Sequence, residues 1–176
     1  MIQVPAEGPH LVVLIGVSGS GKSQLARSLF RQPGQVVSLD ALRATVSGDE
    51  SDQAATADAV ALMHQILAAR LRRQLTTAVD ATNVQDTARA PLLDAARQQG
   101  MCAAALIVDT PLPVCLARNA ARPGLVAGAR WARRVPDHVI FRQYTNLIRS
   151  LPGLPGEGFA HVLVYDGRPD CTARAS

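Results

Sequence analysis

The chain has 176 residues, of which 48% are hydrophobic and 3% aromatic, and its formal net charge is +4. This length suits one domain with a full core, which must be built from Ala, Val, Leu and Ile, as in helices packed on a parallel sheet. The three cysteines and four histidines are scattered and include no C-x-x-C pair, so the sequence indicates neither a disulfide framework nor a zinc site.

Residues 1–10 contain two prolines and a glycine and are expected to form a flexible leader. They lack the basic region and the long apolar stretch of a secretory signal. No apolar run elsewhere in the chain approaches membrane-spanning length. We therefore expect a cytoplasmic protein with no membrane partner.

An apolar run at residues 11–15 predicts a strand buried on both faces of a parallel sheet, and a helix is expected over residues 22–30. Between them the sequence reads G-V-S-G-S-G-K-S, which fits the phosphate-binding loop pattern G-x-x-x-x-G-K-[ST] at every fixed position. Lys22 is the only lysine in the chain. Its slim, flexible ammonium can reach the β- and γ-phosphates of a nucleotide, where the flat fork of an arginine fits poorly.

We predict that nucleotide phosphates bind to this loop and to the start of the helix. Glycines let the backbone turn its N–H groups toward the phosphates, and the helix N-terminus adds positive potential. The hydroxyl of Ser23 would contact Mg²⁺. The predicted nucleotide-binding residues are Gly16, Ser18, Gly19, Ser20, Gly21, Lys22 and Ser23.

The rest of the chain alternates expected strands with expected helices. Strands are expected at residues 36–39, 78–81, 103–109 and 162–165, and helices at 41–46, 52–74, 86–99, 112–121 and 130–151, with Pro136 marking a break or a helix start. This alternation predicts a three-layer α/β domain over residues 11–166, in which a mostly parallel five-stranded sheet is flanked by helices. Residues 167–176 are expected to form a flexible tail.

Ligands on such sheets gather at the C-terminal ends of the strands, so Asp40, residues 80–83 and Asp109 should meet the phosphate-binding loop. Guanine-specific GTPases need a second lysine in an N-K-x-D element, which this chain lacks. ATPase motors usually place a glutamate after the aspartate that ends a strand, but Asp80 is followed by Ala81. A kinase remains, because it needs one aspartate at the acceptor hydroxyl and a mobile cationic lid.

Asp40, at the end of the second expected strand, is the candidate for that aspartate, because its carboxylate could accept the proton of the acceptor. An aspartate there could equally cap the helix that follows. Arg43 lies one helical turn away, where it could hold an acceptor phosphate or lie on the solvated surface. Arg118 and Arg122, spaced i, i+4, would point the same way and belong to a lid over residues 112–135, or to an ordinary basic helix face.

Five segments of the chain occur together in a recognisable order. They are the loop G-V-S-G-S-G-K-S, S-L-D-A-L-R at residues 38–43, S-G-D-E-S-D-Q at 47–53, V-D-A-T-N at 79–83 and C-L-A-R-N-A-A-R-P at 115–123. Together they resemble the 5′-polynucleotide kinase module of bacterial polynucleotide kinase-phosphatase end-healing enzymes, in the P-loop kinase superfamily. The similarity covers roughly residues 11–165.

The resemblance implies a P-loop kinase fold with a helical lid. It also implies an ATP- and Mg²⁺-dependent transfer of the γ-phosphoryl group to the 5′-hydroxyl end of DNA or RNA, as in nucleic acid repair. The residues that match the family are Lys22 and Ser23 for phosphate and Mg²⁺, Asp40 for the general base, Arg43 and Gln53 for the acceptor site, and Arg118 and Arg122 for the lid arginines on the donor phosphates.

Other arginines could attract the phosphates of a longer nucleic acid, with aromatic residues nearby for base stacking, or could simply be solvated. They are Arg130, Arg133, Arg134, Arg142 and Arg149, with Trp131 and Phe141.

Two alternatives to a polynucleotide kinase stay open. One is a small-molecule kinase of similar fold that acts on a sugar, an antibiotic or a nucleoside, and the other is a non-catalytic ATP-binding module. The oligomeric state is also open, with a homodimer among the alternatives.

Overall fold

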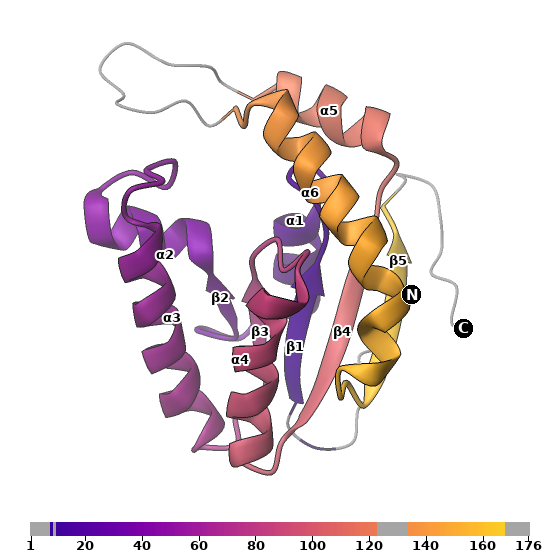
Figure 1. The fold of residues 1–176 in the computed structure, drawn as a ribbon. Helices are drawn as coiled ribbons and strands as arrows, with labels where there is room; N and C mark the ends of the chain where they lie inside the picture. The colour runs from indigo at the N-terminus through magenta and orange to yellow at the C-terminus, as the bar shows by residue number, and fades with distance from the viewer. Residues whose placement is uncertain (1–7, 9, 123–133, 168–176) are drawn as a thin grey trace.

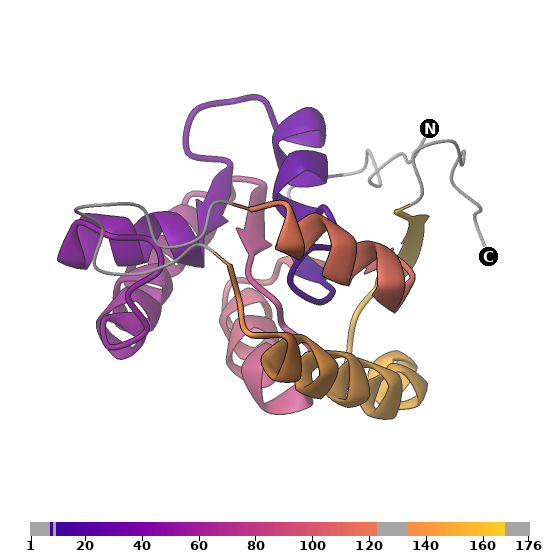
Figure 2. The same cartoon turned by 90° about the horizontal axis from the view of Figure 1, so that it is seen from above.

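A computed structural model describes residues 8, 10–122 and 134–167 of the chain. Within this part, five strands form one sheet with helices on both of its faces (Figure 1 and Figure 2). The strands are β1 (His10–Ile15), β2 (Val36–Ser38), β3 (Thr77–Asp80), β4 (Cys102–Asp109) and β5 (His161–Asp166). The helices are α1 (Lys22–Leu29), α2 (Leu39–Ser47), α3 (Thr56–Leu71), α4 (Asp86–Gln98), α5 (Leu112–Ala120), α6 (Asp137–Ser150) and the 3₁₀ helix η1 (Leu151–Gly156).

The sheet has the strand order β2-β3-β1-β4-β5, and every pair of neighbouring strands is parallel. The central strand β1 is completely buried on both faces. Leu11, Val13 and Ile15 pack in the cluster that contains residues of α3, α4 and α6, whereas Val12 and Leu14 pack with residues of α1. These contacts confirm the predicted three-layer α/β fold with a parallel five-stranded sheet.

The parallel arrangement brings the carboxyl ends of all strands to one edge of the sheet. The connections from β1 to α1, from β2 to α2, from β3 to α4 and from β4 to α5 all leave from this edge, and α5 and α6 lie above it (Figure 1). The segments that the sequence predicted to share a ligand site are therefore neighbours in space.

The boundary between β2 and α2 differs from the sequence prediction. We expected the strand to reach residue 39 and Asp40 to end it, but the strand ends at Ser38 and the helix begins at Leu39. Ser38 takes the N-cap position, without a side-chain capping hydrogen bond. Asp40 instead lies in the first turn of α2, where its charge complements the helix dipole, so the alternative that it caps this helix is wrong.

The helix expected over residues 52–74 is shorter at both ends. Before α3, the carboxylates of Asp49 and Asp52 each accept a hydrogen bond from the backbone N–H two residues further on, which favours turns over helix. After α3, Gln74 adopts a left-handed φ of 53°. The helix α6 begins directly after Pro136, so this proline marks a helix start, which was one of the two alternatives predicted for it. The 3₁₀ helix η1 follows α6 where no separate element was expected.

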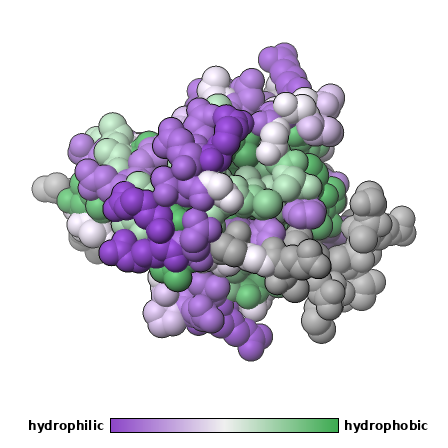
Figure 3. Space-filling model, turned by 90° about the horizontal axis from the view of Figure 1, so that it is seen from below, coloured by the Kyte–Doolittle hydropathy of each residue, from purple (hydrophilic) through white to green (hydrophobic). Residues whose placement is uncertain are grey.

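Several predictions lie outside the described residues. They concern most of the leader at 1–10, the middle of the expected lid at 123–133 with its arginines 130 and 133 and Trp131, and the tail at 168–176. Among the described helices, none combines the length and the apolar character that a membrane span requires. The end of the molecule away from α5, seen from below in Figure 3, mixes hydrophilic with hydrophobic residues.

Candidate active site

The phosphate-binding loop connects β1 to α1 and is held from two sides. The N–H of Gly16 donates to the carbonyl oxygen of Thr82, after β3, at 3.0 Å. Gly19 has a φ of +86°, and a Cβ atom at this position would collide with the backbone carbonyl of Cys115 in α5. Position 19 therefore requires glycine, and the loop packs directly on α5.

Lys22 is buried at the base of this loop, with 7% of its surface exposed. Its Nζ donates to the carbonyl oxygen of Val17 at 2.9 Å and to the hydroxyl of Ser20 at 3.5 Å. Burial lowers the pKa of Lys22 from 10.5 to about 8, and the carboxylates of Asp80 and Asp40 partly oppose this by favouring the charged form. The ammonium thus stays charged near neutral pH, although it is removed from water.

Asp80 belongs to the site, as its position after the third expected strand predicted, although the sequence assigned it no role. It is the last residue of β3, it is 6% exposed, and its charge acts on Lys22. A carboxylate at the end of a buried strand beside the loop strand is the signal that could have identified it.

The donor atoms around Lys22 fit a magnesium ion. Mg²⁺ prefers oxygen ligands and is usually held by one or two protein groups together with waters and substrate phosphates. Ser23, the second residue of α1, supplies a partly exposed hydroxyl, and Asp80 supplies a buried carboxylate. These two side chains are the residues that would hold the ion beside the nucleotide phosphates.

Asp40 and Arg43 meet on one face of α2, as their i, i+3 spacing predicted, and form an ion pair. The Nε of Arg43 also donates to the carbonyl oxygen of Glu50 at 2.9 Å. As a result the Arg43 side chain is only 11% exposed, whereas that of Asp40 is 63% exposed. The arginine is held in place, and the carboxylate is accessible to a second substrate.

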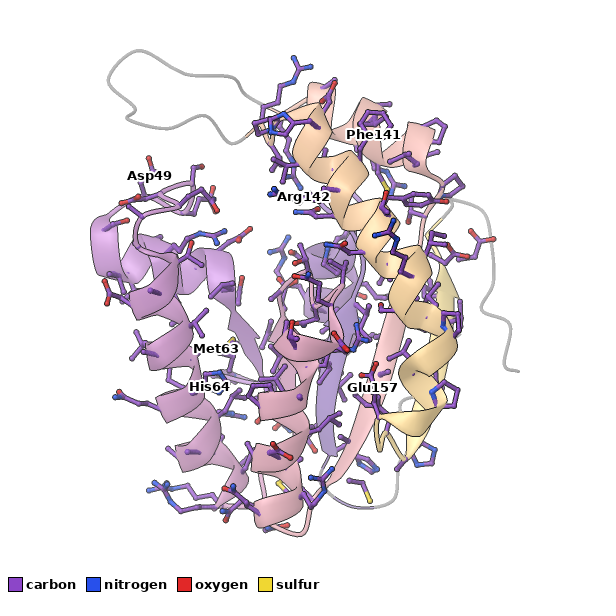
Figure 4. The ribbon with its side chains drawn as sticks, viewed as in Figure 1. Asp49, Met63, His64, Phe141, Arg142 and Glu157 are labelled. Atoms are coloured by element: carbon purple, nitrogen blue, oxygen red, sulfur yellow. The ribbon has the colours of Figure 1, made fainter. Side chains whose placement is uncertain are left out.

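Gln53 lies in the turn between α2 and α3, and its side chain is exposed. Its Nε2 donates to the carbonyl oxygen of Ser51, within its own turn, at 3.3 Å. Asp49 stands at the top of the same turn, and Arg142 on α6 lies opposite it across the upper edge of the molecule (Figure 4). The structure thus shows the Gln53 side chain bonded within its own turn.

The two lid arginines have different surroundings. Arg118 is partly buried, and its guanidinium donates to the carbonyl oxygens of Ser20, at 3.2 Å, and of Gly167, at 3.0 Å. Arg122 is exposed, and its charge contributes to lowering the pKa of Lys22. Arg118 therefore joins the phosphate-binding loop to the end of β5, whereas Arg122 extends toward solvent near Lys22.

A buried ion pair supports the connection after β3. Sequence analysis did not predict it, because arginine is rarely fully buried. The Arg89 side chain is 0% exposed, and its Nε donates to a carboxylate oxygen of Glu157 at 2.7 Å. Its Nη1 donates to the carbonyl oxygen of Asn83 at 2.8 Å, and the Asn83 amide donates to the carbonyl of Leu14 at 2.8 Å. This network fixes the connection that contacts Gly16.

The sequence pattern also gave no indication of a contact from α6. The carboxamide of Gln143 accepts a hydrogen bond from the backbone N–H of Ser18, inside the loop, at 2.8 Å. No periodicity or motif connects these two positions, which are 125 residues apart.

Residues 11–144 match a protein family described as the AAA domain. The matched segment covers more than half of the chain and contains the loop, the Asp40–Arg43 pair and both lid arginines. The chain belongs to this family. A comparison of this AAA domain with curated proteins found no sequence match.

Solved structures of similar fold include a chain of the Pnkp1/Rnl/Hen1 RNA repair complex, with a TM-score of 0.66 and 19% identity over 83% of this chain and 46% of that one. A chain of an AvrRxo1-ORF1:-ORF2 complex has a TM-score of 0.70 and 12% identity over 95% and 57%. A gluconokinase from Sinorhizobium meliloti 1021 has a TM-score of 0.56 and 21% identity over 92% and 85%. The present chain thus spans about half the length of the first two.

These likenesses confirm the P-loop kinase fold that the sequence predicted. Together with the AAA-domain match they show a nucleotide-binding P-loop domain of the kinase type. The same fold occurs in an RNA repair complex and in a gluconokinase, so the fold does not select the acceptor.

Proposed function

We propose that this chain transfers the γ-phosphoryl group of ATP to the 5′-hydroxyl end of DNA or RNA, as in nucleic acid end repair. The observation that carries the proposal is the Asp40–Arg43 pair at the start of α2, where an accessible carboxylate stands beside an anchored guanidinium. A nucleic acid end offers a matching pair of groups, a hydroxyl for the carboxylate and a neighbouring phosphate for the arginine.

The donor half of the reaction uses the phosphate-binding loop. Its N–H groups and Lys22 would hold the β- and γ-phosphates, and Ser23 with Asp80 would hold Mg²⁺. Magnesium would neutralise charge on the phosphate oxygens during transfer. An ammonium has three N–H donors, so Lys22 can bond to a phosphate oxygen while it keeps its bond to the carbonyl oxygen of Val17.

The acceptor half uses α2. The 5′-hydroxyl oxygen attacks the γ-phosphorus and its proton passes to the Asp40 carboxylate, while the bond from the γ-phosphorus to the bridging oxygen breaks and ADP leaves. Arg43 exchanges its contact with Asp40 for the acceptor phosphate, which frees the carboxylate at the moment it must act as a base. Gln53, in the turn that follows α2, would contact the acceptor.

Arg118 and Arg122 would act on the transferring phosphate from the side of α5. Arg122 is exposed near Lys22, where it would contact a bound phosphate, whereas two N–H groups of Arg118 already donate to the carbonyl oxygens of Ser20 and Gly167. This difference predicts that Arg122 carries more of the charge stabilisation and Arg118 more of the positioning of the loop.

A small-molecule kinase is the second candidate, favoured by the likeness to a gluconokinase that the chain covers over 85% of its length. The decisive experiment measures transfer of labelled γ-phosphate from ATP with Mg²⁺ to 5′-hydroxyl DNA and RNA oligonucleotides, and in parallel to a panel of sugars and nucleosides. We expect transfer to an oligonucleotide, and we expect the Lys22→Ala variant to lose this transfer.

Transfer to a metabolite but to neither oligonucleotide would replace the proposal with the second candidate. ATP binding without any transfer would indicate a non-catalytic module.

A further inference from the structure

Gln143 connects α6 to the interior of the phosphate-binding loop. Its Oε1 accepts the hydrogen bond from the backbone N–H of Ser18 at 2.8 Å. A backbone N–H can only donate, so the side-chain atom that faces it must be the carboxamide oxygen. The helix behind this side chain is firmly seated, because Ile140 and Leu147 on α6 are buried in the core.

The peptide group that bonds to Gln143 also holds Lys22. The carbonyl of Val17 and the N–H of Ser18 belong to one planar unit, and they point to opposite sides of it. The carbonyl oxygen accepts from Lys22 Nζ at 2.9 Å, while the N–H donates to Gln143. Any rotation of this peptide would withdraw both groups together. Given these two bonds and the size of a peptide, the carboxamide lies less than about 9 Å from the ammonium.

Other donors of the loop bond to backbone carbonyl groups. The N–H of Gly16 donates to the carbonyl of Thr82, and the N–H of Ser20 donates to the carbonyl of Val17, in the same peptide, at 3.1 Å. The N–H of Ser18 is different, because its acceptor is a side chain from a distant helix. Gln143 is thus the point at which α6 can influence the ammonium of Lys22 without touching it.

We propose that Gln143 is a positioning residue for Lys22, because it holds the Val17–Ser18 peptide in the orientation whose carbonyl directs the ammonium. This role concerns the donor side of the site. It rests on nucleotide binding by the loop and not on the identity of the acceptor.

The lone lysine makes the proposal directly measurable. In protein labelled with carbon-13 at the lysine Cε, one side-chain signal reports Lys22. Gln143→Met keeps the length of the side chain and removes the acceptor, so we expect a shifted Lys22 signal. We also expect hydrogen exchange at the Ser18 amide to rise about 3- to 10-fold, as for the loss of one neutral hydrogen bond. Gln143→Glu retains an oxygen acceptor and should keep the slow exchange of Ser18.

Three further variants separate positioning from a general effect on the helix. Thr145→Met changes an exposed residue of α6 and should leave both signals unchanged. Gln143→Asn withdraws the oxygen by one methylene while keeping an amide, and it replaces the methionine variant if that one unfolds. Asp80, Asp40, Cys115 and Arg122 also act electrostatically on Lys22, and all four are retained in each variant.

An unchanged Lys22 signal and unchanged Ser18 exchange in a folded Gln143→Met or Gln143→Asn variant would overturn the proposal. Equal changes in Thr145→Met, or loss of Ser18 protection in Gln143→Glu, would overturn it as well. None of these measurements needs an acceptor, so a failure to phosphorylate oligonucleotides would leave this test intact.

Discussion

The two halves of the candidate site are built in different ways. The donor half, residues 16–23, is a loop held by backbone contacts, in which Lys22 is almost completely buried and position 19 admits only glycine. The acceptor half, formed by α2 and the turn at residues 48–55, offers exposed side chains, and the Asp40 carboxylate is 63% exposed.

Under the proposed function, this difference separates the residues that hold the nucleotide from the residues that select the acceptor. Backbone groups in a tight loop bind any nucleotide phosphate and tolerate little change, because the loop is packed on α5 and on the connection after β3. Exposed side chains on one helix can change without disturbing the core. Substitutions in the acceptor half should therefore alter transfer while the protein stays folded, whereas several in the donor half should also alter stability.

The largest expected effect comes from Asp40→Asn. Loss of a general base should reduce oligonucleotide phosphorylation by about 10²- to 10⁴-fold, while ATP binding and the thermal unfolding midpoint are largely retained. The matched control is Asp94→Asn, since Asp94 and Arg97 form an exposed i, i+3 ion pair on α4. Equal loss of transfer in the two variants would show that Asp40 is not the general base.

A pair of glycine substitutions tests the rigidity of the donor half. Gly48 and Gly19 both have positive φ angles, but only a Cβ at position 19 meets another atom. Gly48→Ala should cost about 1 kcal/mol from its backbone conformation alone. Gly19→Ala should cost about 1–3 kcal/mol more, because it also collides with Cys115. Urea denaturation measures both, and equal costs would show that the loop can move away from α5.

Arg43→Lys tests whether the anchored guanidinium binds the acceptor. A lysine keeps the charge but loses the planar fork, so the KM for a 5′-hydroxyl oligonucleotide should rise about tenfold with a smaller change in kcat. Arg97→Lys on α4 is the control and should change neither constant. A fall in kcat at constant KM would instead place Arg43 on the transferring phosphate.

The smallest effect concerns pH. Phosphates favour the ammonium form of Lys22, and its pKa is about 8, so above that pH the protein must take up a proton to bind ATP. Affinity for ATP should be about twofold weaker at pH 8 than at pH 6.5 from this group alone and should fall further as the pH rises. Calorimetry in buffers of different ionisation enthalpy measures the proton uptake. Lys22→Arg, which stays protonated, should lack it.

The sequence allowed much of the donor half to be predicted, because a backbone phosphate site needs a contiguous motif between a strand and a helix. Asp40 and Arg43 were also found, since their spacing places both on one helix face. The place of Asp80 beside the loop was predicted from its position at a strand end, but the sequence did not assign it a role. Arg89 and Gln143 act through partners 68 and 125 residues away, and only the fold brings them together.

The pairing of Arg89 with Glu157 also has a consequence for the order in which parts of the chain fold during synthesis. The two residues are 68 positions apart, so a ribosome completes the phosphate-binding loop long before it delivers Glu157. Until then the guanidinium lacks its carboxylate, and enclosing an unpaired charge is strongly unfavourable. The nascent chain should therefore acquire protection around the connection after β3 only once η1 has emerged, and pulse-labelling of stalled chains would reveal this late step.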